Sequence, residues 1–191
     1  YRVWVLCGDS EMAEGSVWEA AEHAGHERLD NLTVIVDVNR LGQRGPTRHG
    51  HDLDAYARRF RAFDWHTIEI DGHDVDAVDR AYGEALSTRG QPTAIIARTL
   101  KGKGVQAVED REGQHGKPVP DADEAIAELG GPRDLTVQVH EPPSARALHS
   151  AGSGQLELPR YEIGDELATR NAFGEALAAL GTARGDVVAL D

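Results

Sequence analysis

A continuous run of apolar and β-branched residues reads Leu32-Thr33-Val34-Ile35-Val36-Asp37-Val38. Apolar and polar residues do not alternate in this run as they do in a half-exposed strand. The run therefore predicts a strand that is covered on both faces. A polar loop with Gly and Pro follows over residues 39–50, and a helical pattern precedes the run over residues 13–26. The apolar side of that helix is expected to carry Val17, Ala20, Ala21 and Ala24.

Predicted strands and helices alternate along the chain on both sides of this run. Upstream, the short apolar run Val3-Trp4-Val5-Leu6-Cys7 ends in Gly8-Asp9, which predicts a buried strand and a turn. Downstream, strands are expected over residues 67–70 and 93–99, and helices over residues 53–63 and 75–86. The second of these helices has Val78, Ala81, Tyr82 and Ala85 in phase. Strands that alternate with helices of this length imply parallel βαβ units, so the fold class is α/β, with an open, mostly parallel sheet and flanking helices.

The composition changes after Lys117, where Pro and Gly become frequent up to Pro159. This stretch indicates a linker, over residues 119–160, with one short helix near residues 123–129. A helix over residues 169–180 and an apolar run over residues 187–190 then predict the start of a second α/β domain at residues 161–191. Because both ends of the chain lie beside apolar runs, we expect it to be an internal piece of a longer protein.

Charge and cysteine content narrow the classes of partner. The net charge is −13, and the densest basic cluster is Arg58-Arg59 with Arg61, so nucleic acid is not an expected partner. The single cysteine, Cys7, permits no intrachain disulfide and lies in an apolar run, which indicates a buried, inert thiol and a cytoplasmic protein. No apolar stretch reaches the roughly 18–20 residues that a membrane span needs, so no membrane partner is expected.

Two of the predicted strands end in residues that can bind a metal ion. Asp9 follows the first strand and Asn39 follows the second, thirty residues later, which is about the length of one βαβ unit. Ligands bind outside the carboxyl ends of the strands in open α/β sheets. Carboxylate, amide and carbonyl oxygens suit Mg²⁺ or Ca²⁺, with phosphate oxygens completing the shell. Taken alone, Asp9 or Ser10 could instead cap the following helix.

Several short blocks in a fixed order carry a more specific pattern. They read Gly8-Asp9-Ser10-Glu11, Glu14-Gly15-Ser16-Val17-Trp18-Glu19-Ala20, Asp37-Val38-Asn39-Arg40-Leu41-Gly42-Gln43, Phe63-Asp64-Trp65-His66, Asp71-Gly72-His73-Asp74, Pro92-Thr93-Ala94-Ile95-Ile96-Ala97, Lys101-Gly102-Lys103-Gly104, His115-Gly116-Lys117-Pro118 and Ala168-Thr169-Arg170. Together these blocks resemble the transketolases, which are enzymes that depend on thiamine diphosphate. The resemblance implies the thiamine-diphosphate-binding fold, with residues 1–118 as part of the diphosphate-binding domain and residues 161–191 as the start of the pyrimidine-binding domain.

The resemblance also implies roles for individual residues. It makes Asp9, Asn39 and the carbonyl of Leu41 the metal ligands. It places Ser10, Gln43, Lys101 and His115 at the cofactor, with His115 also facing the sugar and acting in catalysis. It makes Glu14 and Glu19 members of a carboxylate network between paired active sites, and Arg170 the clamp for the substrate phosphate. Ser10 departs from the family pattern, which has glycine there, so the local geometry of the turn is open.

For the complete enzyme the resemblance implies transfer of a two-carbon ketol unit from a ketose phosphate to an aldose phosphate, in a cytoplasmic homodimer. The glutamate that activates the cofactor and the upstream histidines of the sugar channel lie outside this sequence, so the chain alone is expected to be inactive. The alternatives are another enzyme with this cofactor, such as a dihydroxyacetone synthase, a deoxyxylulose-phosphate synthase or a 2-oxo acid dehydrogenase subunit. A truncated binding fragment without catalysis is the alternative from a different class.

Overall fold

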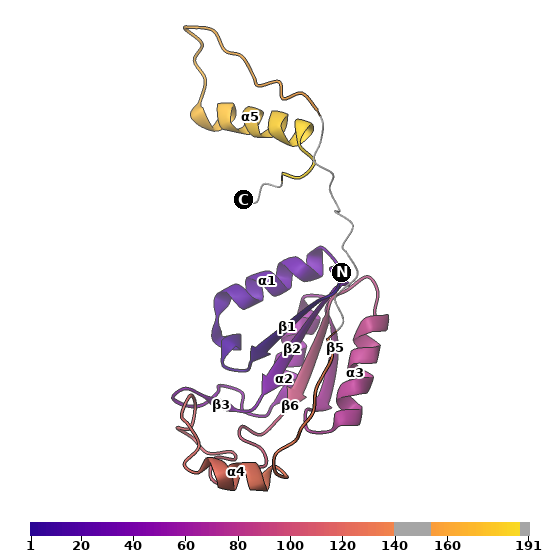
Figure 1. Ribbon diagram of the computed structural model, residues 1–191. Coiled ribbons are helices and arrows are strands. Elements are labelled where there is room, and N and C mark those ends of the chain that lie inside the picture. Colours follow the sequence, from indigo (N-terminus) through magenta and orange to yellow (C-terminus); the bar gives the residue numbers. More distant parts are fainter. Residues whose placement is uncertain (140–153, 188–191) are drawn as a thin grey trace. The chain divides into compact units, whose positions relative to one another are not determined.

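Parallel pairing organises the sheet of the computed structural model, which describes residues 1–139 and 154–187 (Figure 1). Within these residues, four strands form one sheet in the order β1-β2-β6-β5. Their bounds are β1 Val3–Gly8, β2 Leu32–Val38, β5 His66–Asp71 and β6 Thr93–Arg98. All three pairs of neighbours are parallel, which confirms the predicted open α/β sheet.

The two central strands, β2 and β6, carry the core. Val34, Val36 and Val38 of β2 are buried against one layer of helices, with Ala94 and Ile96 of β6 beside them. That layer consists of α1 Gly15–His26 and α2 Leu53–Ala62. The opposite layer is α3 Val75–Ser87, which packs on Ile95 of β6. The prediction that the run at 32–38 is covered on both faces is therefore confirmed.

The first strand is less buried than its sequence predicted. β1 lies at an edge of the sheet, and its Trp4, Val5 and Leu6 are 41%, 39% and 72% exposed. The α3 helix packs over the other strands and reaches this edge where Tyr82 contacts Trp4, with ring centroids 5.2 Å apart. Leu6 lies nearer the carboxyl end of β1, where the described residues provide no such cover. The strand therefore lies where it was predicted, but the prediction that it is buried was wrong.

The helices follow the predicted pattern with small shifts. The first helix begins at Gly15 instead of residue 13, because residues Glu11–Ala13 form a separate 3-10 turn, η1, and Glu14 has an extended backbone. Ala20 is exposed, whereas Ala21 and Ala24 are buried, so Ala20 was wrongly assigned to the apolar side. Asp52 and Asp74 cap α2 and α3 by accepting hydrogen bonds from backbone N–H groups of the first turn.

The loop at residues 39–50 contains a small hairpin that was not predicted. Its strands, β3 Leu41–Gly42 and β4 Gly45–Pro46, pair antiparallel. Gly45 has φ of 110°, a conformation that side chains other than glycine rarely adopt. Each strand has two residues, which is too short for an alternating pattern to be recognised in the sequence.

The rest of the described chain consists of turns and two helices. The α4 helix spans Ala122–Glu128, close to the predicted 123–129, and α5 spans Thr169–Ala183, longer than the predicted 169–180. Contacts divide the chain into units Tyr1–Thr136 and Val137–Asp191, so α5 is described by itself. Of the predicted apolar run at 187–190, residues 188–190 lie outside the described residues. No helix in the described ranges is long and apolar enough to cross a membrane.

The packing of α1 generates a test of the fold. A Cβ atom built at Gly25 of α1 would lie 1.8 Å from the carbonyl oxygen of Phe63. The two atoms would clash, so the backbone would have to move. We expect Gly25→Ala to lower the free energy of unfolding by about 1–3 kcal/mol, as overpacking does. Thermal unfolding followed by circular dichroism measures the change.

Gly83 of α3 is the matched control, because a Cβ there meets no heavy atom within 4 Å. Gly83→Ala should raise stability by about 0.5–1 kcal/mol, since glycine disfavours a helix interior. Equal stability of Gly25→Ala and the parent chain would show that α1 does not approach Phe63 in this way.

Candidate functional site

All predicted site residues of the first unit except Glu19 gather at the carboxyl edge of the sheet. A cavity of about 650 Å³ opens there, where β1 and β2 end. It is lined by Gly8, Asp9, Ser10, Glu11, Glu14, Asp37, Asn39, Leu41, Gln43, Lys101 and His115. The structure thus brings together eight of the predicted residues, from Asp9 to His115, which are 106 positions apart in the chain. Glu19 and Arg170 are the two predicted residues that do not line it.

Asp9 is the most buried acid of the cavity, at 4% exposed. Its Oδ2 atom accepts hydrogen bonds from the backbone N–H of Arg40 and from the hydroxyl of Thr47, both at 2.8 Å. Among the described residues, no donor contacts its other oxygen. The carboxylate is therefore held through one oxygen, and the second remains able to bind a cation.

Asn39 is oriented by an acid of the preceding strand. Its Nδ2 donates to Oδ2 of Asp37 at 2.9 Å, so the amide oxygen must point the other way. That oxygen accepts from the backbone N–H of Leu41 at 3.1 Å and has a second lone pair for another partner. Thr99 donates its hydroxyl to Oδ1 of Asp37, which holds the acid in turn.

This supporting role of Asp37 was missed in the sequence. The sequence does carry a signal for it, because Asp37 is the single acid in a strand whose other residues are apolar or β-branched. A carboxylate on a strand that is covered on both faces must find donors nearby. The donors here come from Asn39 and from Thr99, which follows β6.

Lys101 connects the hairpin with the loop that carries His115. Its ammonium lies 3.4 Å from the carbonyl oxygen of Leu41 and 3.1 Å from Nδ1 of His115. An ammonium group has only donors, so Nδ1 must accept, and a neutral imidazole then carries its proton on Nε2. His115 can therefore offer an Nε2–H donor to a ligand.

The turn after β1 tolerates serine. Ser10 has φ of −69° and ψ of −30°, an ordinary helical conformation, so the position does not need the freedom of glycine. Glu11, which was not predicted as a site residue, accepts from the backbone N–H of Gly8 at 2.5 Å. Cys7 is half-buried and not fully buried as expected. Burial, and next the charge of Glu11, still raise the pKa of its thiol, which disfavours the reactive thiolate.

The two glutamates and the arginine have different surroundings. Glu14 lies at the start of α1 and lines the cavity. Glu19 is exposed on α1, outside the cavity lining. Arg170 is exposed in the first turn of α5, in the second unit, so its place relative to the cavity is not determined.

An ion pair joins the two loops that bear the site. Arg40, between Asn39 and Leu41, places its guanidinium 2.8 Å from Oδ2 of Asp110. The N–H of Asp110 donates to the carbonyl oxygen of Lys101 at 2.8 Å. Hydrogen bonding between the partners raises the pKa of Arg40 and lowers the pKa of Asp110. Both residues have positive φ, of 63° and 53°, so the contacts of this pair hold a backbone that is uncommon for side chains other than glycine.

The arrangement could hold a hard cation together with an anionic ligand. The oxygens of Asp9, Asn39 and Leu41 are of the type that magnesium and calcium prefer. In the described ranges, no three His, Cys, Asp or Glu side chains gather as a metal site. A cation here would therefore need further oxygens from a ligand or water, and Lys101 with His115 would favour a ligand that is anionic.

Three comparisons agree on what the chain is similar to. Residues 1–132 match the family model described as "Transketolase, thiamine diphosphate binding domain". The chain is 45% identical over 196 residues to the transketolase of Homo sapiens, a match that covers 100% of the chain and 31% of that protein. It therefore spans about a third of the length of this curated relative.

Solved structures give the same result. A crystal structure of transketolase from Campylobacter jejuni aligns with a TM-score of 0.64 at 28% identity, over 71% of this chain and 22% of that one. A transketolase structure from Pichia stipitis, in complex with sedoheptulose 7-phosphate, aligns with a TM-score of 0.62 at 30% identity, over 68% of this chain and 20% of that one.

The Arg40–Asp110 pair generates a prediction on loop order. Asp110→Asn removes the charge that pairs with Arg40, so amides of residues 101–111 should exchange with deuterium faster at pH 7. The folded-state pKa of Asp110 is lowered, so its contribution is present above its ordinary value of about 3.9 and is lost as the pH falls through the folded value. The parent loop should therefore loosen only in strongly acid solution.

Hydrogen–deuterium exchange with mass spectrometry measures both effects. Asp54→Asn is the matched control, since Asp54 pairs with Arg58 on α2. If Asp110→Asn and Asp54→Asn leave the exchange of residues 101–111 equally unchanged, the ion pair does not order the loop.

Proposed function

This chain belongs to the transketolase family through the thiamine diphosphate binding domain, and we propose that it forms the diphosphate and metal side of a ketol-transfer site. The full reaction would move a two-carbon ketol unit from a ketose phosphate to an aldose phosphate. The observation that carries the proposal is the convergence of Asp9, Asn39 and Leu41 with Lys101 and His115 around one cavity. The reported relatives are transketolases, which favours this reaction over that of a dihydroxyacetone synthase.

The oxygens of the site fit a divalent metal ion that is shared with a diphosphate. We propose Mg²⁺, with Ca²⁺ as the alternative, held by the free oxygen of Asp9, the amide oxygen of Asn39 and the carbonyl of Leu41. Asp37 supports this proposal, because it accepts a hydrogen bond from the Asn39 amide nitrogen and so turns the amide oxygen of Asn39 away from its own carboxylate. When bound, thiamine diphosphate supplies the nucleophilic carbon and the electron sink of the reaction.

The remaining residues would bind and orient. The Lys101 ammonium places a positive charge beside the carbonyl of Leu41, where it can neutralise diphosphate oxygens. The Nε2–H of His115 can donate to the diphosphate or to a sugar hydroxyl, because Lys101 occupies the other ring nitrogen. Ser10 and Gln43 line the same cavity and complete the proposed cofactor contacts.

The substrate and the assembly are further parts of the proposal. We propose phosphorylated sugars as substrates, in line with the sugar phosphate bound to the Pichia stipitis transketolase. Arg170 would hold the sugar phosphate, and Glu14 and Glu19 would join a carboxylate network with a second copy in a cytoplasmic homodimer. Residues 1–118 would belong to the diphosphate-binding domain, residues 119–160 to a linker, and residues 161–191 to the pyrimidine-binding domain.

The metal proposal predicts the effect of one charge on cofactor binding. In the full-length protein, Asp9→Asn should weaken binding of thiamine diphosphate with Mg²⁺ about ten- to a hundredfold, because it removes the charged metal ligand and keeps the side-chain shape. Asn39→Ala, which removes a neutral ligand, should weaken it less. Isothermal titration calorimetry measures the Kd, with the exposed Asp76→Asn of α3 as the control. Unchanged affinity in Asp9→Asn would refute the metal assignment.

The substrate proposal predicts selective kinetics for Arg170. In the full-length protein, Arg170→Ala should raise KM for phosphorylated sugars about ten- to a hundredfold, since it removes a charge-assisted contact. The unphosphorylated donor hydroxypyruvate should be used almost as before, because it never makes that contact. Steady-state assays compare both donors, with Arg160→Ala as the control for a lost arginine in the same unit. Equal damage to both donors would make Arg170 structural.

A further inference from the structure

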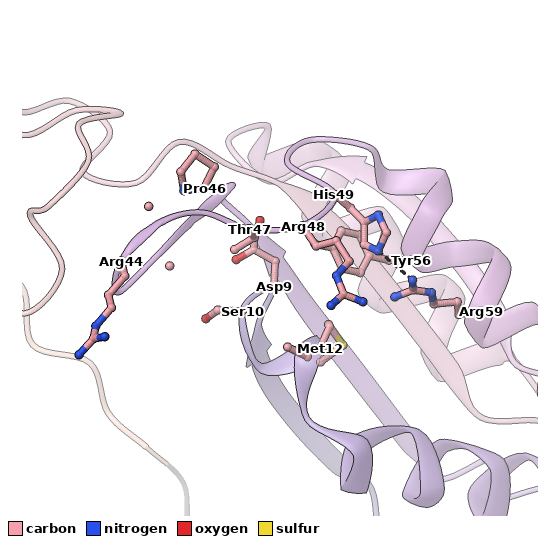
Figure 2. Close-up of a pocket in the computed structure, with 13 residues that line it drawn as sticks. Asp9, Ser10, Met12, Arg44, Pro46, Thr47, Arg48, His49, Tyr56 and Arg59 are labelled. Carbon is pink, nitrogen blue, oxygen red and sulfur yellow. Dashed lines mark hydrogen bonds between the residues drawn. The ribbon is translucent and has the colours of Figure 1, made fainter.

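A second cavity shares Asp9 and Ser10 with the proposed cofactor site but has a different chemical character (Figure 2). It measures about 260 Å³ and lies among the end of η1, the hairpin, the following loop and α2. The polar side chains that matter here are Thr47, Arg48, His49, Tyr56 and Arg59. We call it the basic cavity.

Three guanidinium groups line the basic cavity, and none has an acidic partner within the described part of the chain. Arg44, Arg48 and Arg59 make no ion pair there, although the neighbouring Arg58 pairs with Asp54 at 2.9 Å. The chain carries a net charge of −13, so acidic side chains are plentiful elsewhere. Three arginines without an ion pair on the wall of one cavity therefore create a local positive potential that an anion can offset.

Arg59 is held in place by its neighbours. Its Nη2 lies 2.8 Å from Nε2 of His49, and its guanidinium carbon lies 5.4 Å from the ring centroid of Trp18. Arginine has no acceptor, so Nε2 of His49 accepts, and the imidazole is neutral in this contact. Burial, then the charges of Arg59 and Arg48, lower the pKa of His49, which keeps the ring neutral at pH 7. The cavity therefore gains no further positive charge from His49, but the guanidinium of Arg59 is fixed in position.

The other polar groups of the wall do not cancel this charge. The hydroxyl of Thr47 donates to Asp9 Oδ2, which also accepts from the backbone N–H of Arg40, so this carboxylate oxygen is already satisfied. Tyr56 is buried, and burial raises the pKa of its phenol, so it stays protonated. The cavity is lined by three arginines, Arg44, Arg48 and Arg59, and by one acid, Asp9, so positive charge is in excess.

We propose that the basic cavity is a second anion site, which binds a phosphate group: free phosphate or the phosphate end of a phosphorylated small molecule. Planar guanidinium groups bind phosphate oxygens in bidentate fashion, and Arg59 is already oriented for this by His49 and Trp18. The basic cavity is distinct from the proposed cofactor cavity although the two share Asp9 and Ser10, since Lys101 and His115 line only the other cavity. Its existence does not depend on bound cofactor.

The test titrates the ¹⁵N-labelled chain with inorganic phosphate at constant ionic strength, with sodium chloride as the matched salt. We expect phosphate to shift the backbone amide signals of Thr47, Arg48 and His49, and chloride not to. Separate titrations with ribose 5-phosphate and with ribose then show whether a phosphorylated small molecule binds through its phosphate. Binding of both phosphates assigns a general phosphate site, and binding of the sugar phosphate alone assigns a phosphomonoester site.

Variants show whether the arginines carry the binding. Arg48→Gln, an exposed position, should weaken phosphate at least about tenfold, and Arg59→Lys should also weaken it because the charge stays but the planar fork is lost. Arg80→Gln on α3 makes the same charge change away from the cavity and should leave the Kd unchanged. Unchanged affinity in Arg48→Gln, or shifts centred on Gly8 and Lys101 instead, would overturn the proposal.

Discussion

Parallel pairing between β1 and β2 places the acid on which the site depends. The strands pair in register up to Gly8 opposite Asp37, and the ladder continues one step further, where the N–H of Asp9 donates to the carbonyl oxygen of Asp37 at 3.1 Å. This contact holds the turn after β1 against the end of β2. Asp9 can therefore accept from the backbone of Arg40, which follows the same strand. The orientation of Asn39 and the position of Leu41 depend on that same short segment.

Local patterns in the sequence were enough to predict the main strands and helices and the residues at the ends of β1 and β2. The run at 32–38 became β2 with the same bounds, and the residues that follow β1 and β2 meet as predicted, because parallel strands end at one edge. The burial of β1 was not predictable in the same way. A strand's sequence does not reveal whether a helix reaches it, and Leu6 is 72% exposed because α3 lies over the other strands.

The site residues that escaped prediction are those whose role comes from a distant partner. Asp37 contacts Thr99 across 62 positions of the chain, Thr47 contacts Asp9 across 38, and Arg40 contacts Asp110 across 70. Of these three residues, only Asp37 carries a signal in the sequence, as the single acid of its strand. By contrast, the turn at Ser10 could be resolved only by its backbone, whose φ of −69° removes the need for glycine. Whether Arg170 reaches the site depends on the placement of the second unit, which the sequence does not specify.

The close approach of α1 to residues 63–65 has a consequence for the order of folding. Trp65 donates its indole N–H to the carbonyl oxygen of Ala21 at 2.8 Å, across 44 positions of the chain, and Gly25 contacts the backbone of Phe63. Such a contact forms only after a long loop has closed, which costs more entropy than a local turn. We therefore expect α1 to dock after α2 and the start of β5 have come together. The turn from Asp9 to Glu14, which leads into α1, would then be among the last parts of the sheet edge to become ordered.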